Sequence, residues 1–197
     1  LPICQRLQQQ KPDLVPLLQI RASEWYEQNG LIDEAIKQAL RAQDFQRAAK
    51  LIARVADGAW ERGEHGKLRH WLESVPLELV YNNPQFCVYL AWSLLADGEL
   101  EEARQALQVA DHALETIAQD GNQPSNLNMQ RLKGKVAATR AFAAFYRGEF
   151  PELFRYASQA LEYLPQQDLS WRSTATHLVG DAYDFQGDMV QAYPSRV

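Results

Sequence analysis

The histidines and cysteines are the residues whose types could support metal or nucleophilic chemistry, and their spacing supports neither. His65 and His70 are five residues apart, a poor helical spacing for a shared metal ion, and no H-E-x-x-H motif occurs. Cys4 and Cys87 are too far apart in sequence to indicate a metal motif or a disulfide framework, as expected for a reducing cytoplasm. No G-x-S-x-G nucleophile motif is present. We therefore expect a non-catalytic, cytoplasmic protein without a metal site.

The composition excludes two further classes of function. Apolar residues make up 46% of the chain and the formal net charge is -5, with the basic residues scattered. A nucleic-acid surface needs clustered Lys and Arg, so we expect no direct nucleic-acid contact. The longest nearly apolar run covers residues 86–96, whereas a membrane-spanning helix needs roughly 20 residues, so we expect no membrane span.

Five glycines recur at intervals that indicate repeats of helical pairs. The intervals are 33, 35, 50 and 39 residues, between Gly30, Gly63, Gly98, Gly148 and Gly187. The first two match the period of about 34 residues that marks tetratricopeptide repeats. A turn-rich insertion at 120–126 accounts for the longest interval. Each glycine is expected to adopt the left-handed conformation where the first helix of a pair turns into the second.

Small residues recur where two paired helices must approach closely. Seven positions before the glycines stand Ser23, Ala56, Ala91, Ala141 and Gly180. Alanine also stands five positions after Gly30, Gly98 and Gly187, at Ala35, Ala103 and Ala192. The sequence predicts an all-α fold: a tetratricopeptide-like superhelix, a right-handed α–α solenoid of about five antiparallel helix pairs. The pairs are expected at 13–42, 44–75, 84–119, 127–164 and 169–197, with a connector at 76–83.

Several helix boundaries carry their own signals. Asn83 before Pro84 is a typical helix start, and Asp44 and Ser170 are expected to cap the helices that follow them. Pro165 lies where the repeat expects its helix-ending proline.

Four strings resemble a known family of regulators. The most distinctive is ASEWYEQNGLIDEAI within residues 21–52, joined by WLESVP (71–76), YLAWSLLADGELEEA (89–103) and DLSWRSTATHLVGDAYDFQGD (168–188). Together they resemble the helical region of large LuxR-type, maltose-activator-like (MalT-like) transcriptional regulators. In that family a nucleotide-binding module and a winged-helix segment precede the helical array, and a helix-turn-helix DNA-binding domain follows it.

The resemblance implies an effector-sensing or oligomerisation module of a bacterial transcriptional activator. Residues 1–12 would then end a winged-helix-like segment, and 13–197 would form a helical repeat domain truncated at its C-terminus. No phosphate-loop motif is present, so ATP is expected only in a preceding domain and no cofactor in this segment. The implied partners are a small inducer, a protein or peptide, neighbouring domains of the same regulator, and a second copy in self-association.

The residues expected to line the concave groove are those at the inward positions of each first helix. They are Lys50, Asp57, Trp60, Glu61, Gln85, Trp92, Lys135, Phe142, Phe145, Tyr146, Thr174, His177, Asp181 and Asp184. Aromatic rings beside carboxylates and amides suit a sugar or peptide ligand. The aromatic members could equally pack between neighbouring helices, and the polar members could form a plain solvated groove.

Arg140 occupies a repeat position that is usually apolar. It is expected to pair with a carboxylate, with Asp181 or Glu149 as candidates, or to line a cavity. Two functions remain as alternatives to the regulatory module: a generic tetratricopeptide scaffold for protein–protein interaction, and a helical accessory domain of an enzyme.

Overall fold

The computed structural model describes residues 14–119, 126–185 and 187. The regular structure of these residues is α-helical, which confirms the prediction of an all-α fold for this part of the chain. The helices form two compact units that divide between Val80 and Tyr81, and each is considered by itself. The expected winged-helix-like end at 1–12 lies outside the described residues.

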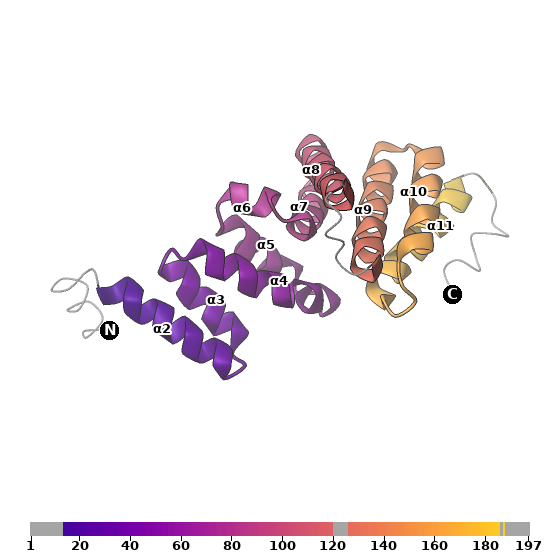
Figure 1. Ribbon diagram of the computed structural model, residues 1–197. Coiled ribbons are helices and arrows are strands. Elements are labelled where there is room, and N and C mark those ends of the chain that lie inside the picture. The colour runs from indigo at the N-terminus through magenta and orange to yellow at the C-terminus, as the bar shows by residue number, and fades with distance from the viewer. Residues whose placement is uncertain (1–13, 120–125, 186, 188–197) are drawn as a thin grey trace. The chain divides into compact units, whose positions relative to one another are not determined.

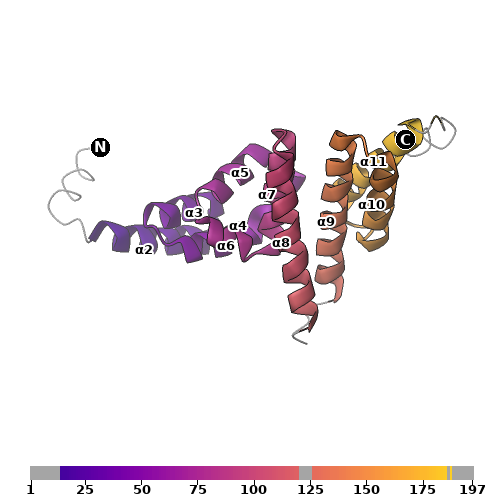
Figure 2. The ribbon, with the colours of Figure 1, turned by 90° about the horizontal axis from the view of Figure 1, so that it is seen from above.

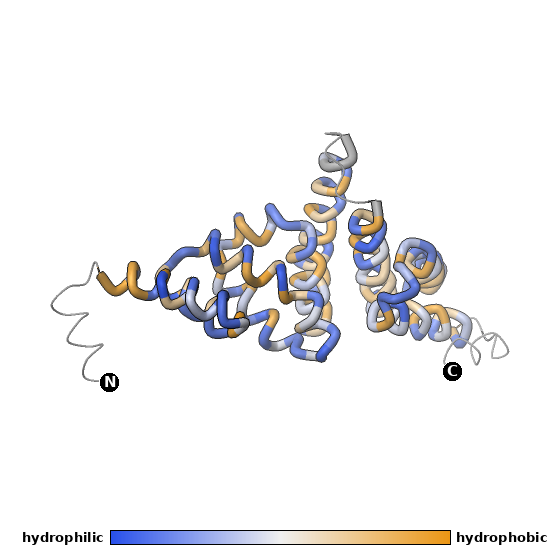
Figure 3. The backbone as a smooth tube through the Cα atoms, turned by 60° about the horizontal axis from the view of Figure 1, so that its bottom comes forward, coloured by the Kyte–Doolittle hydropathy of each residue, from blue (hydrophilic) through white to orange (hydrophobic). Residues whose placement is uncertain are grey.

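The first unit contains two pairs of packed helices and a short fifth helix (Figure 1). These are α2 (Leu14–Gln28), α3 (Ile32–Arg41), α4 (Phe45–Glu61), α5 (His65–Glu73) and α6 (Leu77–Tyr81). Hydrophilic and hydrophobic residues alternate along the helices (Figure 3), and the buried core of this unit includes the fully buried alanines Ala35, Ala39 and Ala48 beside larger apolar residues. Small core residues let the helices approach closely.

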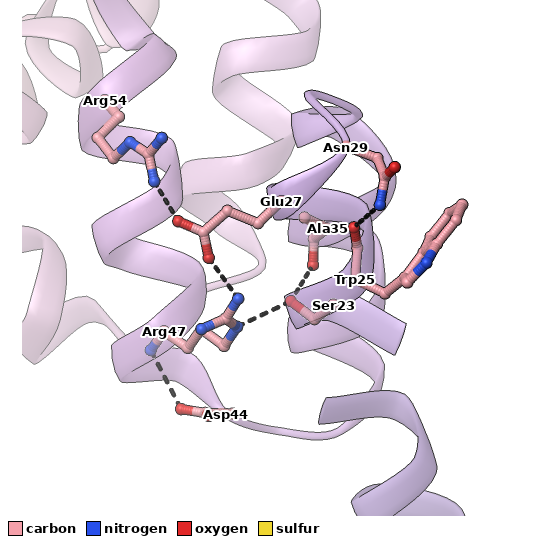
Figure 4. A network of polar contacts seen from close by, with 8 residues as sticks. All are labelled: Ser23, Trp25, Glu27, Asn29, Ala35, Asp44, Arg47 and Arg54. Carbon is pink, nitrogen blue, oxygen red and sulfur yellow. Dashed lines mark hydrogen bonds and ion pairs between the residues drawn. The ribbon is translucent and has the colours of Figure 1, made fainter. Parts of the chain in front are cut away.

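A polar contact joins α2, α3 and α4 in the first unit (Figure 4). The Ser23 hydroxyl is fully buried and donates to the carbonyl oxygen of Ala35 at 2.8 Å. It also accepts from Nε of Arg47 on α4 at 2.9 Å. Arg47 and Arg54 both pair with Glu27 on α2. The serine at this small-residue position therefore links α2, α3 and α4 through one oxygen atom.

The second unit contains two helical pairs followed by one further helix (Figure 2). These are α7 (Pro84–Ala96), α8 (Leu100–Gln119), α9 (Asn126–Arg147), α10 (Phe150–Tyr163) and α11 (Leu169–Phe185). α7 packs on α8, α9 on α10, and α10 on α11. Each of the first four predicted pairs is thus present as two consecutive packed helices. The second helix of the predicted fifth pair lies outside the described residues.

The turn inside each pair uses the left-handed conformation expected from the glycine spacing. Gly30, Gly63, Gly98 and Gly148 have φ between 69° and 82°. The N–H of Gly63 bonds the carbonyl of Trp60, and the next N–H bonds the carbonyl five residues back, both at 2.9 Å. These two hydrogen bonds close the end of the helix, and the chain turns within three residues.

The turn between α3 and α4 has the same geometry without a glycine. Gln43 has φ 58°, and its N–H bonds the carbonyl of Leu40 at 3.0 Å. The N–H of Asp44 bonds the carbonyl of Ala39 at 3.0 Å. A left-handed conformation costs a residue with a side chain about 1–2 kcal/mol. Here the backbone bonds and the buried helices on either side hold it in place.

Most of the predicted helix boundaries are confirmed. Asn83 accepts from the N–H of Gln85 at 3.0 Å, and Asp44 accepts from the N–H of Arg47 at 3.1 Å. α10 ends two residues before Pro165, with Leu164 already extended. These capping interactions are local, so the sequence alone predicts them.

One boundary expectation was wrong. α11 begins at Leu169, and Asp168 rather than Ser170 accepts the first helical bond, from the N–H of Arg172. The connector 76–83 contains the short helix α6, because the carbonyl of Pro76 accepts from the N–H groups of Leu79 and Val80. Burial of Val80, at 1% exposure, favours this turn.

We expect Gln43→Gly to raise the free energy of unfolding by up to about 1 kcal/mol, because glycine adopts φ 58° without steric cost. The matched variant Gly63→Ala should lower it by about 1 kcal/mol, since a side chain at φ 72° is strained although the space is open. Urea denaturation followed by circular dichroism measures both. A loss of stability in Gln43→Gly would contradict the assignment of strain to this turn.

We expect Ser23→Ala to lower the free energy of unfolding by about 1–2 kcal/mol, because it removes the donor to Ala35 and an acceptor of Arg47. Ser74→Ala is the matched control, since the exposed Ser74 hydroxyl bonds only the carbonyl of His70 four residues back. The control should change stability by less than about 0.5 kcal/mol. Equal effects of the two substitutions in the same denaturation assay would show that the three-helix contact contributes nothing.

Candidate functional site

A cluster of aromatic rings connects α7, α9 and α11 in the second unit. Trp92 on α7 stacks on Phe142 of α9, with ring centroids 4.3 Å apart and an interplanar angle of 6°. Tyr146, one turn further along α9, meets Phe142 edge-on at 4.9 Å. Trp171 of α11 meets Trp92 edge-on at 5.6 Å. Offset and edge-on ring pairs are the favoured geometries, so these contacts favour one arrangement of the three helices.

Lys135 lies at the buried end of this cluster. Its side chain is on α9, and the residue is 3% exposed. The ammonium lies 5.6 Å and 5.7 Å from the ring centroids of Tyr89 and Trp171, and it donates to the Tyr89 hydroxyl at 3.3 Å. Ring faces attract a cation and offset part of the free energy lost when its water is removed. The side-chain nitrogen of this lysine thus lies between rings, at the end of the cluster away from the exposed Tyr146.

The structure therefore brings together four of the predicted groove residues, namely Trp92, Lys135, Phe142 and Tyr146. Phe145 joins them through an edge-on contact with Tyr146 at 5.9 Å. Sequence reasoning missed Tyr89 and Trp171. Both are buried, at 1% exposure each, so only their ring contacts distinguish them from ordinary core residues.

The other predicted residues of the second unit lie outside this ring cluster. Gln85 is half-buried on the first turn of α7. On α11, Thr174 donates to the carbonyl of Ser170 at 3.2 Å and His177 is exposed. Asp181 and Asp184 are half-buried further along α11.

The predicted residues of the first unit all lie on α4. Lys50 and Glu61 are exposed and Asp57 is half-buried. Trp60 is only 5% exposed and packs edge-on against the ring of His65 at 4.3 Å, so its side chain belongs to the core of this unit. A single lining formed by both units stays a prediction, because each unit is described separately.

The predicted carboxylate partners of Arg140 were wrong. Arg140 pairs with Asp111 on α8, whereas Glu149 pairs with Arg147. The sequence could not show that α8 and α9 face one another at this point. Burial raises the pKa of Asp111, against the effect of the Arg140 charge. Arg140 also lies over the ring of Tyr156 at 5.6 Å.

Two hollows adjoin Arg140 and are formed by α8, α9 and α10. One has a volume of about 390 Å³ and the other about 540 Å³, and Arg140 lines both. None of the predicted groove residues lines either hollow. Arg140 therefore lines two hollows, and the aromatic residues predicted for the groove line neither of them.

Neither a metal site nor a reactive thiol is found in the part of the chain that the structure describes. Within it, no three His, Cys, Asp or Glu side chains gather where they could hold an ion. Burial raises the pKa of the Cys87 thiol to about 12, which makes it a poor nucleophile. Among the same residues, no helix is long and apolar enough to cross a bilayer.

We expect Trp92→Ala to lower the free energy of unfolding by about 2–4 kcal/mol, because it removes a ring held between Phe142 and Trp171. Tyr146→Ala should cost about 1 kcal/mol or less, since Tyr146 is 48% exposed. Guanidinium denaturation of the two variants measures the difference. If Tyr146→Ala were as destabilising as Trp92→Ala, Tyr146 would be a structural residue and not part of an accessible surface.

The chain is similar to several regulators of one name. It is 26% identical over 181 residues to the HTH-type transcriptional regulator MalT of Serratia proteamaculans (strain 568), covering 91% of this chain. It is 27% identical over 180 residues to the regulators of that name from Yersinia pestis (strain Pestoides F) and Yersinia pseudotuberculosis serotype O:1b (strain IP 31758), again over 91% of this chain.

The similarity covers a limited part of these relatives. The chain spans about a fifth of their length, 19% of each. No protein-family model matches it. The resemblance indicated by the four sequence strings is nevertheless confirmed: over most of its length, this chain is similar to the MalT-type, LuxR-like transcriptional regulators.

Proposed function

We propose that the chain is a non-catalytic effector-sensing and oligomerisation module of a cytoplasmic LuxR-type transcriptional activator. The observation that carries the proposal is the similarity to MalT regulators over 91% of the chain. In this proposal the helical pairs of residues 13–197 form a right-handed tetratricopeptide-like superhelix. Residues 1–12 are the last part of a preceding winged-helix-like segment. ATP would act in a preceding domain, and this segment would contact neighbouring domains or a second copy but not DNA.

The aromatic cluster is the proposed place of effector or partner binding. Its exposed end is formed by Tyr146, which is 48% exposed, and by the half-buried rings of Trp92 and Phe142. An exposed aromatic ring suits the apolar face of a sugar ring or a peptide side chain. Because the exposed rings belong to α7 and α9, a ligand that contacts them favours one relative position of these helices over another.

The experiment is calorimetric titration of the 197-residue chain with a panel of oligosaccharides and other metabolites, with light scattering to follow self-association. We expect one member of the panel to bind and Tyr146→Ala to weaken that binding by tenfold or more, because ring contacts are lost. Trp25→Ala is the matched control. Trp25 is 56% exposed and packs on Tyr26 in the first unit, so the control should bind as the unmodified chain does.

The possible results separate the functional alternatives. If circular dichroism shows a folded chain, but no member of the panel binds and none changes self-association, the chain is not an effector-sensing module. A protein partner whose binding is lost in Tyr146→Ala, without any small ligand, would favour a generic interaction scaffold. Equal weakening by Tyr146→Ala and Trp25→Ala would remove the aromatic cluster as the site.

A further inference from the structure

The hollow of about 390 Å³ between α8, α9 and α10 has walls of opposite charge. Asp111 and Glu115 lie four residues apart on α8, which places them on one face of that helix. Lys133 and Arg140 lie seven residues apart on α9, again on one face. The lining therefore carries two carboxylates on one helix and two cations on the other.

The floor of this hollow is apolar. Leu114, Val136 and Ala137 line it, with exposures of 3–5%. Gln159 and Tyr163 of α10 add an amide and a phenol. Ligand pockets typically combine such an apolar base with a few polar groups, and volumes of about 300–1,000 Å³ are usual for them.

The end of the hollow near Tyr163 is held in place by tight contacts. A Cβ added to Gly134 of α9 would lie 2.6 Å from Cγ of Leu164 and 3.0 Å from its backbone nitrogen. Lys133 directly precedes Gly134, and Tyr163 directly precedes Leu164. The close approach of Gly134 and Leu164 therefore positions the backbone of both lining residues. Arg172 donates to the carbonyl of Leu164 at 2.8 Å and fixes the end of α10.

A second contact nearby fixes α9 against the start of α11. Arg131 donates to both carboxylate oxygens of Asp168, at 2.5 Å and 2.9 Å, and Asp168 is 2% exposed. A bidentate pair with a buried carboxylate is geometrically restrictive. The hollow is therefore formed before any ligand arrives, which lowers the free energy lost on ordering it.

The charges select the class of ligand. The pair of Arg140 and Asp111 is about one-third exposed on each side, 33% and 30%, so both groups retain hydrogen-bonding positions towards the hollow. The two carboxylates would repel a ligand that carries only negative charge. Lys133 and Arg140 would repel a ligand that carries only positive charge. A ligand with one positive and one negative group, such as the ammonium and the carboxylate of an amino acid, meets opposite charge on both walls.

We propose that this hollow binds a small zwitterion, an amino acid or a dipeptide with an apolar side chain. The ligand's ammonium would bind Asp111 and Glu115, its carboxylate would bind Lys133 and Arg140, and its side chain would lie on Leu114 and the floor beside it. Carboxylates accept strong charge-assisted hydrogen bonds from Arg and Lys, and ammonium groups donate them to Asp and Glu.

This site is separate from the aromatic cluster, and the inference does not rest on the proposed regulatory function. With about 100° between successive helix residues, Arg140 and Val136 point roughly 100–160° away from Phe142 and Lys135 around α9. One face of α9 thus serves the rings and another serves the charged hollow.

The test is calorimetric titration of the 197-residue chain with L-leucine and with L-alanyl-L-leucine. The control ligand is N-acetyl-L-alanyl-L-leucine amide, which has the same apolar side chains and neither charge. We expect at least one zwitterion to bind, and the capped dipeptide to bind at least tenfold more weakly. No binding by either zwitterion, or equal binding by the capped dipeptide, would overturn the proposal.

Substitutions at the rim of the hollow test whether the ligand binds there. Lys133→Gln and Glu115→Gln change exposed residues, so the fold should be retained. Each should weaken zwitterion binding by about tenfold through the loss of one charge-assisted contact. The matched controls are Lys37→Gln and Glu24→Gln, which are exposed in the first unit and should bind as the unmodified chain does. Unchanged binding in both rim variants would overturn the site.

Discussion

The left-handed residue between the two helices of each pair is the constraint on which the rest of the structure depends. It reverses the chain within three residues, so the two helices that flank it must lie side by side from their first turns. Helices this close need small residues where they touch, and the fully buried Ala35, Ala56 and Ala141 meet that need. Where Ser23 replaces alanine, its hydroxyl bonds the carbonyl of Ala35 across the same contact.

Small residues lie between the two helices of a pair, whereas larger side chains lie between successive pairs. These larger side chains determine how one pair packs on the next. In the second unit that contact is aromatic: α7, α9 and α11 are joined by Trp92, Phe142 and Trp171. Ring pairs have preferred geometries but shallow energy wells, about 0.5–1.5 kcal/mol each beyond their burial. A ligand of ordinary affinity is therefore able to shift them, which is the physical reason to place effector sensing there.

The two faces of α9 have opposite character. One carries the rings and the buried Lys135, and the other carries Lys133 and Arg140 in a hollow of mixed charge. The Arg140–Asp111 pair links α9 to α8, while Gly134 and Arg131 link α9 to the ends of α10 and α11. A ligand on either face would contact α9 and a helix of the preceding pair, so both proposed sites act on the same junction.

The sequence by itself determined the helices, their turns and most of their caps. Glycine spacing, Asn83–Pro84 and Asp44 act through atoms within five residues, so local rules predict them. It did not predict that Asp111 faces Arg140 or that Trp171 reaches Trp92. These contacts depend on how far each helix rotates and shifts as it packs. That rotation is the sum of many small side-chain contacts, and only the tertiary structure fixes it.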